Sequence, residues 1–259
     1  MAVNRAISVG IAVLSSLLFV GCSPDQQSAQ QSLNGNDSIV VFAAASLKHA
    51  FTEIGQRFEK DNPGATVEFS FAGSSDLVTQ LTQGAAADVF AAADTTSMDK
   101  AQRAGLLSHQ PVNFASNTLT IVVAPGNPRH INTIRDLADA KLNLVTCAPQ
   151  VPCGAATQKV EKAANVHLSP VSEESSVTEV LNKVTIGQAD AGLVYVTDAI
   201  GAGDKVTAIA FPETADAVNT YPIAALTQSK NSSLAGKFIE SVTDSSGQEV
   251  LAKSGFGKA

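Results

Sequence analysis

Two kinds of hydrophobic pattern alternate along most of the chain. Short runs made almost entirely of apolar residues, such as 39–42 and 191–195, are typical of strands buried in a sheet. Between such runs, apolar residues recur three or four positions apart, which is the spacing of one face of a helix. The segment 47–58 is the clearest example, because its leucine, isoleucine and phenylalanine residues follow this spacing with charged residues between them. The alternation predicts an α/β fold in which helices flank mainly parallel sheets.

The alternation occurs in two series. The first series predicts strands and helices at 39–42, 47–58, 66–71, 76–83, 88–93 and 94–104. The second begins with a strand at Leu119 and continues with elements at 134–138, 142–147, 155–164, 177–184, 191–195, 221–226, 234–242 and 248–253. We expect a first lobe from 38–117 and 222–259, and a second lobe from 118–221. Open α/β sheets bind ligands beyond the carboxyl ends of their strands, so a ligand cleft is expected between the lobes.

The first residues have the composition of an export signal. Arg5 is followed by the uncharged apolar run 7–20, which is too short to span a bilayer as a mature helix. The run ends in a glycine and Cys22, as in a bacterial lipobox, where cleavage makes the cysteine the lipidated first residue. We expect a signal peptide at 1–21, a lipid anchor at Cys22 and, over 22–37, a flexible tether too polar to fold. The protein is then exported and held on the extracytoplasmic face of the membrane; an ordinary signal peptide is the alternative.

Charge and histidine placement exclude several kinds of partner. The chain has 17 Lys and Arg against 24 Asp and Glu, a net charge of −7, and no basic stripe. Nucleic-acid binding is therefore not expected. His109, His130 and His167 lie in polar settings without a second histidine four positions away, so the sequence predicts no metal site and no cofactor.

Two cysteines remain beyond the N-terminal one. Cys147 and Cys153 bracket a short loop that contains two prolines. Disulfides persist in exported proteins, so this pair favours a disulfide bond. Metal binding is the alternative, but two thiols without a nearby histidine make an incomplete site.

Serines recur where predicted strands give way to helices. Ser46 and Ser74 have this setting, and 175–176 is a less clear third case. A single serine in such a place is most simply an N-cap that satisfies a free backbone N–H group. If several of these helix starts converge, however, their N–H groups, dipoles and hydroxyls form an anion site that needs no Lys or Arg.

Five sequence motifs carry a resemblance to a known family. They are VFAAASL at 41–47, FAGSSDL at 71–77, GAAADVFAAAD at 84–94, VPCG at 151–154 and GLVYVTDA at 192–199. In this order, over 38–256, they resemble the extracytoplasmic molybdate-binding proteins of ABC importers, the ModA family. The resemblance implies a two-lobed, type II periplasmic-binding-protein fold that closes around a tetrahedral oxyanion as a monomer, without catalysis. It also implies the membrane permease of the importer as a partner.

The resemblance further implies which residues bind the ligand. Ser46 and Ser74 would supply hydroxyl and backbone N–H donors from the first lobe. Cys153 and Val177 would supply backbone N–H donors from the second lobe, and the Tyr195 hydroxyl would complete the set. Many relatives carry alanine in place of Cys153, a change that a backbone donor tolerates.

Molybdate and tungstate fit a site built only of donors, because these dianions are fully deprotonated and only accept hydrogen bonds. A protonated phosphate does not fit, since its O–H would meet no acceptor. Sulfate is also acceptor-only, so a binding protein for sulfate or another oxyanion on the same fold is the alternative. A serine hydrolase using Ser46 or Ser74 is a rival function, but the chain lacks a G-x-S-x-G motif. A lipoprotein without a ligand is the third possibility.

Overall fold

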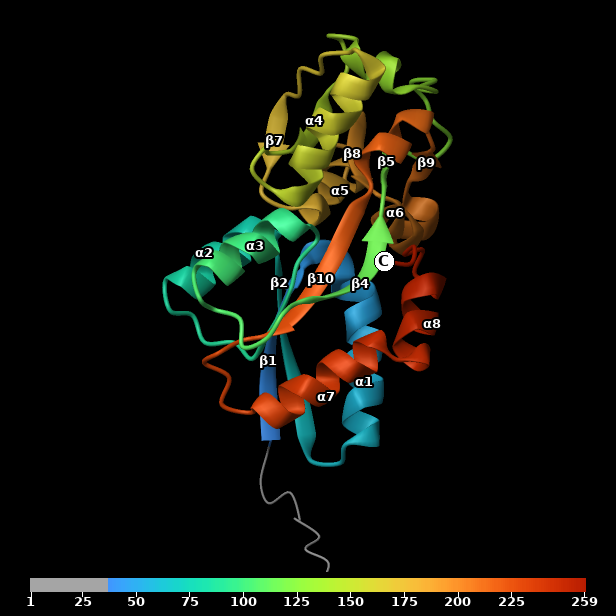
Figure 1. Ribbon diagram of the computed structural model, residues 1–259. Coiled ribbons are helices and arrows are strands. Elements are labelled where there is room, and N and C mark those ends of the chain that lie inside the picture. Colours follow the sequence, from blue (N-terminus) through green and yellow to red (C-terminus); the bar gives the residue numbers. More distant parts are fainter. Residues whose placement is uncertain (1–36) are drawn as a thin grey trace, which may run out of the picture. The chain divides into compact units, whose positions relative to one another are not determined.

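The structure is a computed structural model that describes residues 37–259. The expected signal peptide, the lipid anchor at Cys22 and the tether up to residue 36 lie outside the described residues. Two five-stranded sheets flanked by helices confirm the expected two-lobed α/β fold (Figure 1). We refer to the sheet that contains β1, with its helices, as the first lobe, and to the other as the second lobe. Within the described part of the chain, no helix is both long and apolar enough to cross a membrane.

The first sheet has the strand order β2-β1-β3-β10-β4. Its strands are β1 (Asp37–Ala44), β2 (Ala65–Ala72), β3 (Val89–Ala91), β4 (Val112–Asn117) and β10 (Asn219–Ala225). Strand β1 pairs in parallel with β2 and β3, whereas β10 is antiparallel to both β3 and β4. The sheet is therefore mainly parallel, as expected, and mixed only through β10, which enters it after the chain has passed through the second lobe.

Helices cover both faces of the first sheet. They are α1 (Lys48–Asp61), α2 (Ser74–Thr82), α3 (Thr95–Arg103), α7 (Ser232–Thr243) and α8 (Ser245–Lys253), and the 3-10 turn η1 (Ala45–Leu47) joins β1 to α1. On one face, Phe238 of α7 packs edge to face against Phe51 and Phe58 of α1. Helices α2 and α3 lie on the other face (Figure 1), where Leu77 and Met98 are buried. Each buried side chain of this size contributes about 1.5–3 kcal/mol.

The second sheet has the order β7-β6-β8-β5-β9. Its strands are β5 (Leu119–Val123), β6 (Leu144–Cys147), β7 (Ser172–Glu174), β8 (Ala191–Tyr195) and β9 (Thr207–Ile209). The second lobe also contains α4 (Pro152–Ala164), α5 (Val177–Thr185), α6 (Val196–Ala202) and the 3-10 turns η2 (Ile134–Ala138), η3 (Gly203–Lys205) and η4 (Pro212–Ala217). This sheet is mixed as well, because β6 is parallel to β7 and β8 while β5 is antiparallel to β8 and β9.

The chain crosses between the lobes twice, and the two crossings are neighbours. Strand β4 ends in the first sheet at Asn117 and β5 begins in the second at Leu119, so the expected boundary at 117/118 falls at the first crossing. The expected boundary at 221/222 instead falls inside β10, which already pairs with β4 at Asn219. Asn219 lies directly opposite Asn117 in the antiparallel register of β4 and β10, which are neighbours in the sheet (Figure 1). This junction supports the site described next.

Candidate functional site

A small cavity lies where loops of the two lobes meet. The first lobe lines it with 44–46, 72–74 and Ala93, and the second with 151–153, 175–177 and Tyr195. The structure thus brings together all five residues expected at the ligand, namely Ser46, Ser74, Cys153, Val177 and Tyr195. The space open to the centre of a water molecule is ≈ 20 Å³. One ordered water needs roughly 10–15 Å³ by the same measure, so the cavity suits a single small ligand.

Ser46 is held in the turn that follows β1. The chain leaves β1 in an extended conformation at Ala44 and enters η1 at once, so Ser46 is the middle residue of a single turn. The serine is 6% exposed, and its Oγ lies 2.9 Å from the Oη of Tyr221. The N-cap of α1 is Leu47, without a side-chain hydrogen bond. Ser46 is therefore not a helix cap, and its hydroxyl is available at the cavity.

Ser74 is the first residue of α2, after the N-cap residue Gly73. Its Oγ accepts a hydrogen bond from the backbone N–H of Ala93, with an N–O distance of 3.0 Å, so this serine does not cap its own helix either. Gly73 lies against the second lobe, where a Cβ atom would stand 2.2 Å from the carbonyl oxygen of Ser175. Any side chain at position 73 would push the two lobes apart beside the cavity.

Two helices of the second lobe begin at the cavity. Helix α4 starts with Pro152, which suits a first turn because the missing N–H would have no partner there. Cys153 follows, and a disulfide with a Cα–Cα distance of 5.7 Å joins it to Cys147 at the end of β6. Val177 opens α5. Backbone N–H groups in the first turn of a helix have no partner in that helix, so these starts supply free donors and the positive ends of helix dipoles.

The third serine case, at 175–176, is an ordinary helix cap. The Oγ of Ser176 accepts the N–H of Glu179 at 3.4 Å, and the carboxylate of Glu179 accepts the N–H of Ser176 at 2.9 Å. This reciprocal pair is a capping box, which ties the Ser176 hydroxyl to α5. The hydroxyls left for a ligand are those of Ser46, Ser74 and Tyr195.

Tyr195 ends β8 and is 1% exposed. The side-chain amide of Asn219 donates to its Oη, with an N–O distance of 2.9 Å. Burial raises the pKa of the Tyr195 phenol well above its ordinary value, so the phenol keeps its proton near neutral pH. The backbone N–H of Tyr195 donates to Asp198, and burial raises the pKa of that carboxyl group to about 7.

The cavity is lined without a charged side chain. Within residues 37–259, no group of three or more His, Cys, Asp or Glu side chains is placed to hold a metal ion. The available donors are neutral hydroxyls and peptide N–H groups at helix starts. Such a set suits an anion that only accepts hydrogen bonds, and the dipoles of the helix starts supply the attraction.

Three polar residues behind the cavity were not expected from the sequence. Asn117, Asn219 and Tyr221 are 4%, 5% and 0% exposed. The side-chain amide of Asn117 donates to the hydroxyls of Thr197 and Tyr221, and that of Asn219 donates to the hydroxyl of Tyr195. In the sequence, the asparagines stand at strand ends, where asparagine ordinarily indicates a turn. Their burial follows only from the pairing of β4 with β10.

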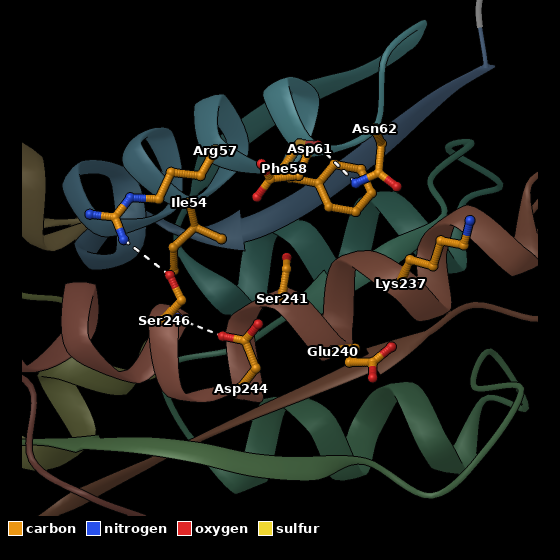
Figure 2. Close-up of a pocket in the computed structure, with 11 residues that line it drawn as sticks. Ile54, Arg57, Phe58, Asp61, Asn62, Lys237, Glu240, Ser241, Asp244 and Ser246 are labelled. Atoms are coloured by element: carbon orange, nitrogen blue, oxygen red, sulfur yellow. Dashed lines mark hydrogen bonds between the residues drawn. The ribbon is translucent and has the colours of Figure 1, made fainter.

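A second pocket, in the first lobe, has a different chemistry. It lies between α1 and the helices α7 and α8, and side chains of both charge signs line it, including Arg57, Lys237, Glu240 and Asp244. Figure 2 shows Arg57 reaching across this pocket to Ser246, with an Nη1–Oγ distance of 3.2 Å. None of the residues expected at the ligand lies there, so it is not the candidate site.

Comparisons with known proteins agree with the fold and with the arrangement of the cavity. Residues 39–257 match the family described as bacterial extracellular solute-binding protein. The molybdate-binding protein ModA of Mycobacterium tuberculosis strain H37Rv is 53% identical over 250 residues, which cover 96% of this chain and 96% of that protein. The molybdate-binding protein ModA of Escherichia coli strain K12 is 31% identical over 254 residues, covering 92% and 96%.

A solved structure supports the fold independently. The periplasmic molybdate-binding protein of Azotobacter vinelandii superposes with a TM-score of 0.75 at 19% identity, covering 85% of this chain and 99% of that one. At this identity the likeness concerns the fold alone. Together with the sequence matches, it leads to one family: the chain belongs to the bacterial extracellular solute-binding proteins, a family of binding proteins and not of enzymes, and within them to the ModA family.

Proposed function

We propose that the protein captures molybdate outside the cytoplasmic membrane and delivers it to the permease of an ABC importer. The observation that carries this proposal is the cavity, because all five expected residues line it and no charged side chain does. The names of the relatives support molybdate as the ligand. Tungstate has the same charge and, like molybdate, only accepts hydrogen bonds, so we expect it to bind in the same place.

The proposed contacts follow from the donors at the cavity wall. Ser46 and Ser74 donate through hydroxyl and backbone N–H groups, Cys153 and Val177 through backbone N–H groups, and Tyr195 through its hydroxyl. A hydrogen bond to a charged acceptor contributes about 1.5–3 kcal/mol, which is more than a bond between neutral groups. Several such bonds offset the cost of removing a dianion from water.

Binding requires the lobes to move. Ser74 and Tyr195 are each 1% exposed, so a ligand reaches them only when the lobes separate. In the described conformation, the Ser75 hydroxyl of the first lobe donates to the Gln150 carbonyl of the second at 2.7 Å. We infer that the ligand closes the lobes and that the permease recognises the closed form.

Substitution of the proposed donors tests the site. Ser46→Ala and Tyr195→Phe each remove one hydroxyl from a buried charged acceptor, so molybdate affinity should fall by about 1–3 kcal/mol in each variant. Calorimetric titration with molybdate measures the change. Ser108→Ala is the matched control, because the Ser108 hydroxyl donates to the Ala225 carbonyl away from the cavity. Unchanged affinity in both site variants would contradict the assignment.

Sulfate is the alternative ligand, because it presents the same pattern of acceptors. Titration of the unmodified protein with both anions decides between them. If sulfate binds as tightly as molybdate, the proposed specificity is wrong.

We also propose that cleavage after residue 21 exposes Cys22 and that a lipid on this cysteine anchors the protein outside the cell membrane. The segment from Cys22 to the start of β1 at Asp37 would let the folded lobes reach the permease. Mass spectrometry of the mature protein tests this proposal. A chain that begins elsewhere, or that carries an unmodified Cys22, would contradict it.

A further inference from the structure

The three hydroxyls at the cavity each lie within hydrogen-bond distance of a polar group of the protein. A hydroxyl has one proton, so an oxygen that already accepts from the protein keeps that proton for another partner. Ser74 is the simplest case, because its Oγ accepts from the backbone N–H of Ala93 at 3.0 Å. An N–H group can only donate, so the direction of this bond is fixed. The proton of Ser74 is left for the cavity.

The direction of the hydrogen bond between Asn219 and the Tyr195 hydroxyl is fixed in a similar way. One amide atom of Asn219 lies 2.8 Å from the carbonyl oxygen of Ala93, which can only accept, so this atom is the amide nitrogen. The same nitrogen lies 2.9 Å from the Oη of Tyr195, and its second proton points to that oxygen. Tyr195 therefore accepts from Asn219, which leaves its own proton for a ligand or for the Tyr221 phenol beside it.

Asn117 acts on Ser46 through Tyr221. The backbone N–H of Thr118 donates to the Oδ1 of Asn117 at 3.0 Å, so the other amide atom of Asn117 is the donor. That nitrogen donates to the hydroxyl of Thr197 at 2.8 Å and to the Oη of Tyr221 at 3.4 Å. Both amide protons of Asn117 are thereby used, and its orientation is set by the backbone.

The direction of the bond between Tyr221 and Ser46 follows from burial. Tyr221 is fully buried, and burial holds the pKa of its phenol well above the ordinary value, so the phenol keeps its proton. Buried donors are almost always paired. The polar groups around this phenol are Asn117, which donates to it, Tyr195, and Ser46, whose Oγ is 2.9 Å away. Either oxygen of the Ser46–Tyr221 pair could donate, and the short distance favours Ser46 as the acceptor of the Tyr221 proton, which leaves the Ser46 proton for the cavity.

We propose that Asn117 and Asn219, paired across β4 and β10, are the positioning residues that make the site accept only fully deprotonated oxyanions. They touch no ligand. Instead, their amides occupy an acceptor position of Tyr195 and, through Tyr221, of Ser46, and so direct the protons of these two hydroxyls towards the ligand. The inference rests on the proposed function and adds to it the origin of the discrimination against protonated anions.

For a protonated ligand, the consequence is that its hydrogen-bond donor faces the donors of the site. Hydrogen phosphate carries a proton that must be donated, and each of the three hydroxyls presents a proton of its own. A donor that meets a donor leaves both unpaired in a buried site, which is costly. Without Asn219 the Tyr195 hydroxyl can rotate and accept the proton of hydrogen phosphate, and without Tyr221 the Ser46 hydroxyl can do so. The preference for molybdate over phosphate should therefore weaken.

The experiment measures a ratio of affinities. Molybdate, sulfate and phosphate are titrated calorimetrically at pH 7 into the unmodified protein, Asn219→Leu and Tyr221→Phe. In the unmodified protein, we expect molybdate to bind much more tightly than phosphate, whose weak affinity is measured by competition with molybdate. In each variant, molybdate affinity should fall about tenfold, a loss of one hydrogen bond to a charged acceptor, while phosphate affinity does not fall. The ratio of molybdate to phosphate affinity should thus decrease by about tenfold or more in both variants.

The controls separate positioning from a merely structural role. Asn231→Leu removes another asparagine whose amide donates to a backbone carbonyl, that of Ser38, away from the cavity, and it should leave all affinities unchanged. If Asn219→Leu fails to fold, Tyr221→Phe decides, because it retains the ring that packs against Phe114 and Phe256. An equal fall in affinity for molybdate and for phosphate, or phosphate binding as tight as molybdate binding in the unmodified protein, would overturn the inference but leave molybdate capture intact. Absence of any oxyanion binding would overturn both.

Discussion

The fold shifts the pKa values of two carboxyl groups in opposite directions. Burial raises the pKa of Asp198 to about 7. The backbone N–H groups of Asn132 and Thr133 donate to Asp136 and lower its pKa. An acid whose pKa is raised by folding stabilises the folded state less as pH rises from about 4 to the folded value. An acid whose pKa is lowered by folding stabilises the folded state above its unfolded pKa, and this stabilisation is lost as pH falls through the folded value.

Substitution by asparagine should therefore have opposite effects at these two sites. Asp198→Asn keeps an oxygen for the N–H of Tyr195 but cannot ionise, so the melting temperature should fall less between pH 5 and pH 8 than in the unmodified protein. Asp136→Asn should lower the melting temperature at pH 7 and have little effect once the carboxyl group of the unmodified protein is protonated. Calorimetric scans across pH measure both. Parallel pH profiles for all three proteins would contradict the assigned causes.

At the residue scale, the sequence predicted the groups at the cavity but not the groups behind them. Ser46, Ser74 and Tyr195 lie in motifs that local sequence makes visible. Asn219 is buried because β10 pairs with β4, a strand about a hundred positions earlier in the chain. Local sequence cannot distinguish such a buried asparagine from one in an exposed turn. The network that orients the hydroxyls was therefore beyond sequence analysis.

At the scale of elements, strongly apolar strands were predicted well, but of the four edge strands only β2 was predicted. The strand expected at 191–195 is β8 with the same bounds. Strands β4, β7 and β9 were missed, and all three lie at the edge of a sheet. An edge strand needs only one neighbour and tolerates polar residues, as in the Ser-Glu-Glu sequence of β7. Hydrophobic periodicity, from which strands are predicted, is weakest in such edge strands.

The disulfide between β6 and α4 is an element-scale device that can be tested. The bond closes a short loop, so its removal in Cys147→Ser with Cys153→Ser should lower the free energy of unfolding by about 2 kcal/mol. Molybdate affinity should change much less, because Cys153 is proposed to bind through its backbone N–H. Guanidinium unfolding with and without reductant measures the effect. A reductant should destabilise the unmodified protein and leave the double variant unchanged; equal stability of both proteins would contradict this role.

At the scale of the whole molecule, the crossings between lobes explain both the mixed sheets and the site. Each sheet combines parallel strands with antiparallel ones at the place where the chain enters or leaves its lobe. Pairings of this kind join distant segments, which is why the sequence predicted two lobes but not their strand pairing. The net charge of −7 does not prevent anion binding, because distant surface charges are screened within about 8 Å at physiological ionic strength.

Closure of the lobes should be measurable at a contact that does not touch the ligand. The Ser75 hydroxyl donates to the carbonyl of Gln150 in the other lobe at 2.7 Å, and this bond can exist only when the lobes are together. Ser75→Ala should weaken molybdate binding about two- to tenfold, mainly through faster dissociation, because the open form loses nothing. Stopped-flow measurement of the dissociation rate tests this. Thr79→Ala is the matched control, since the Thr79 hydroxyl bonds within α2. A dissociation rate of Ser75→Ala equal to that of the control would mean that the ligand-bound protein does not make this contact.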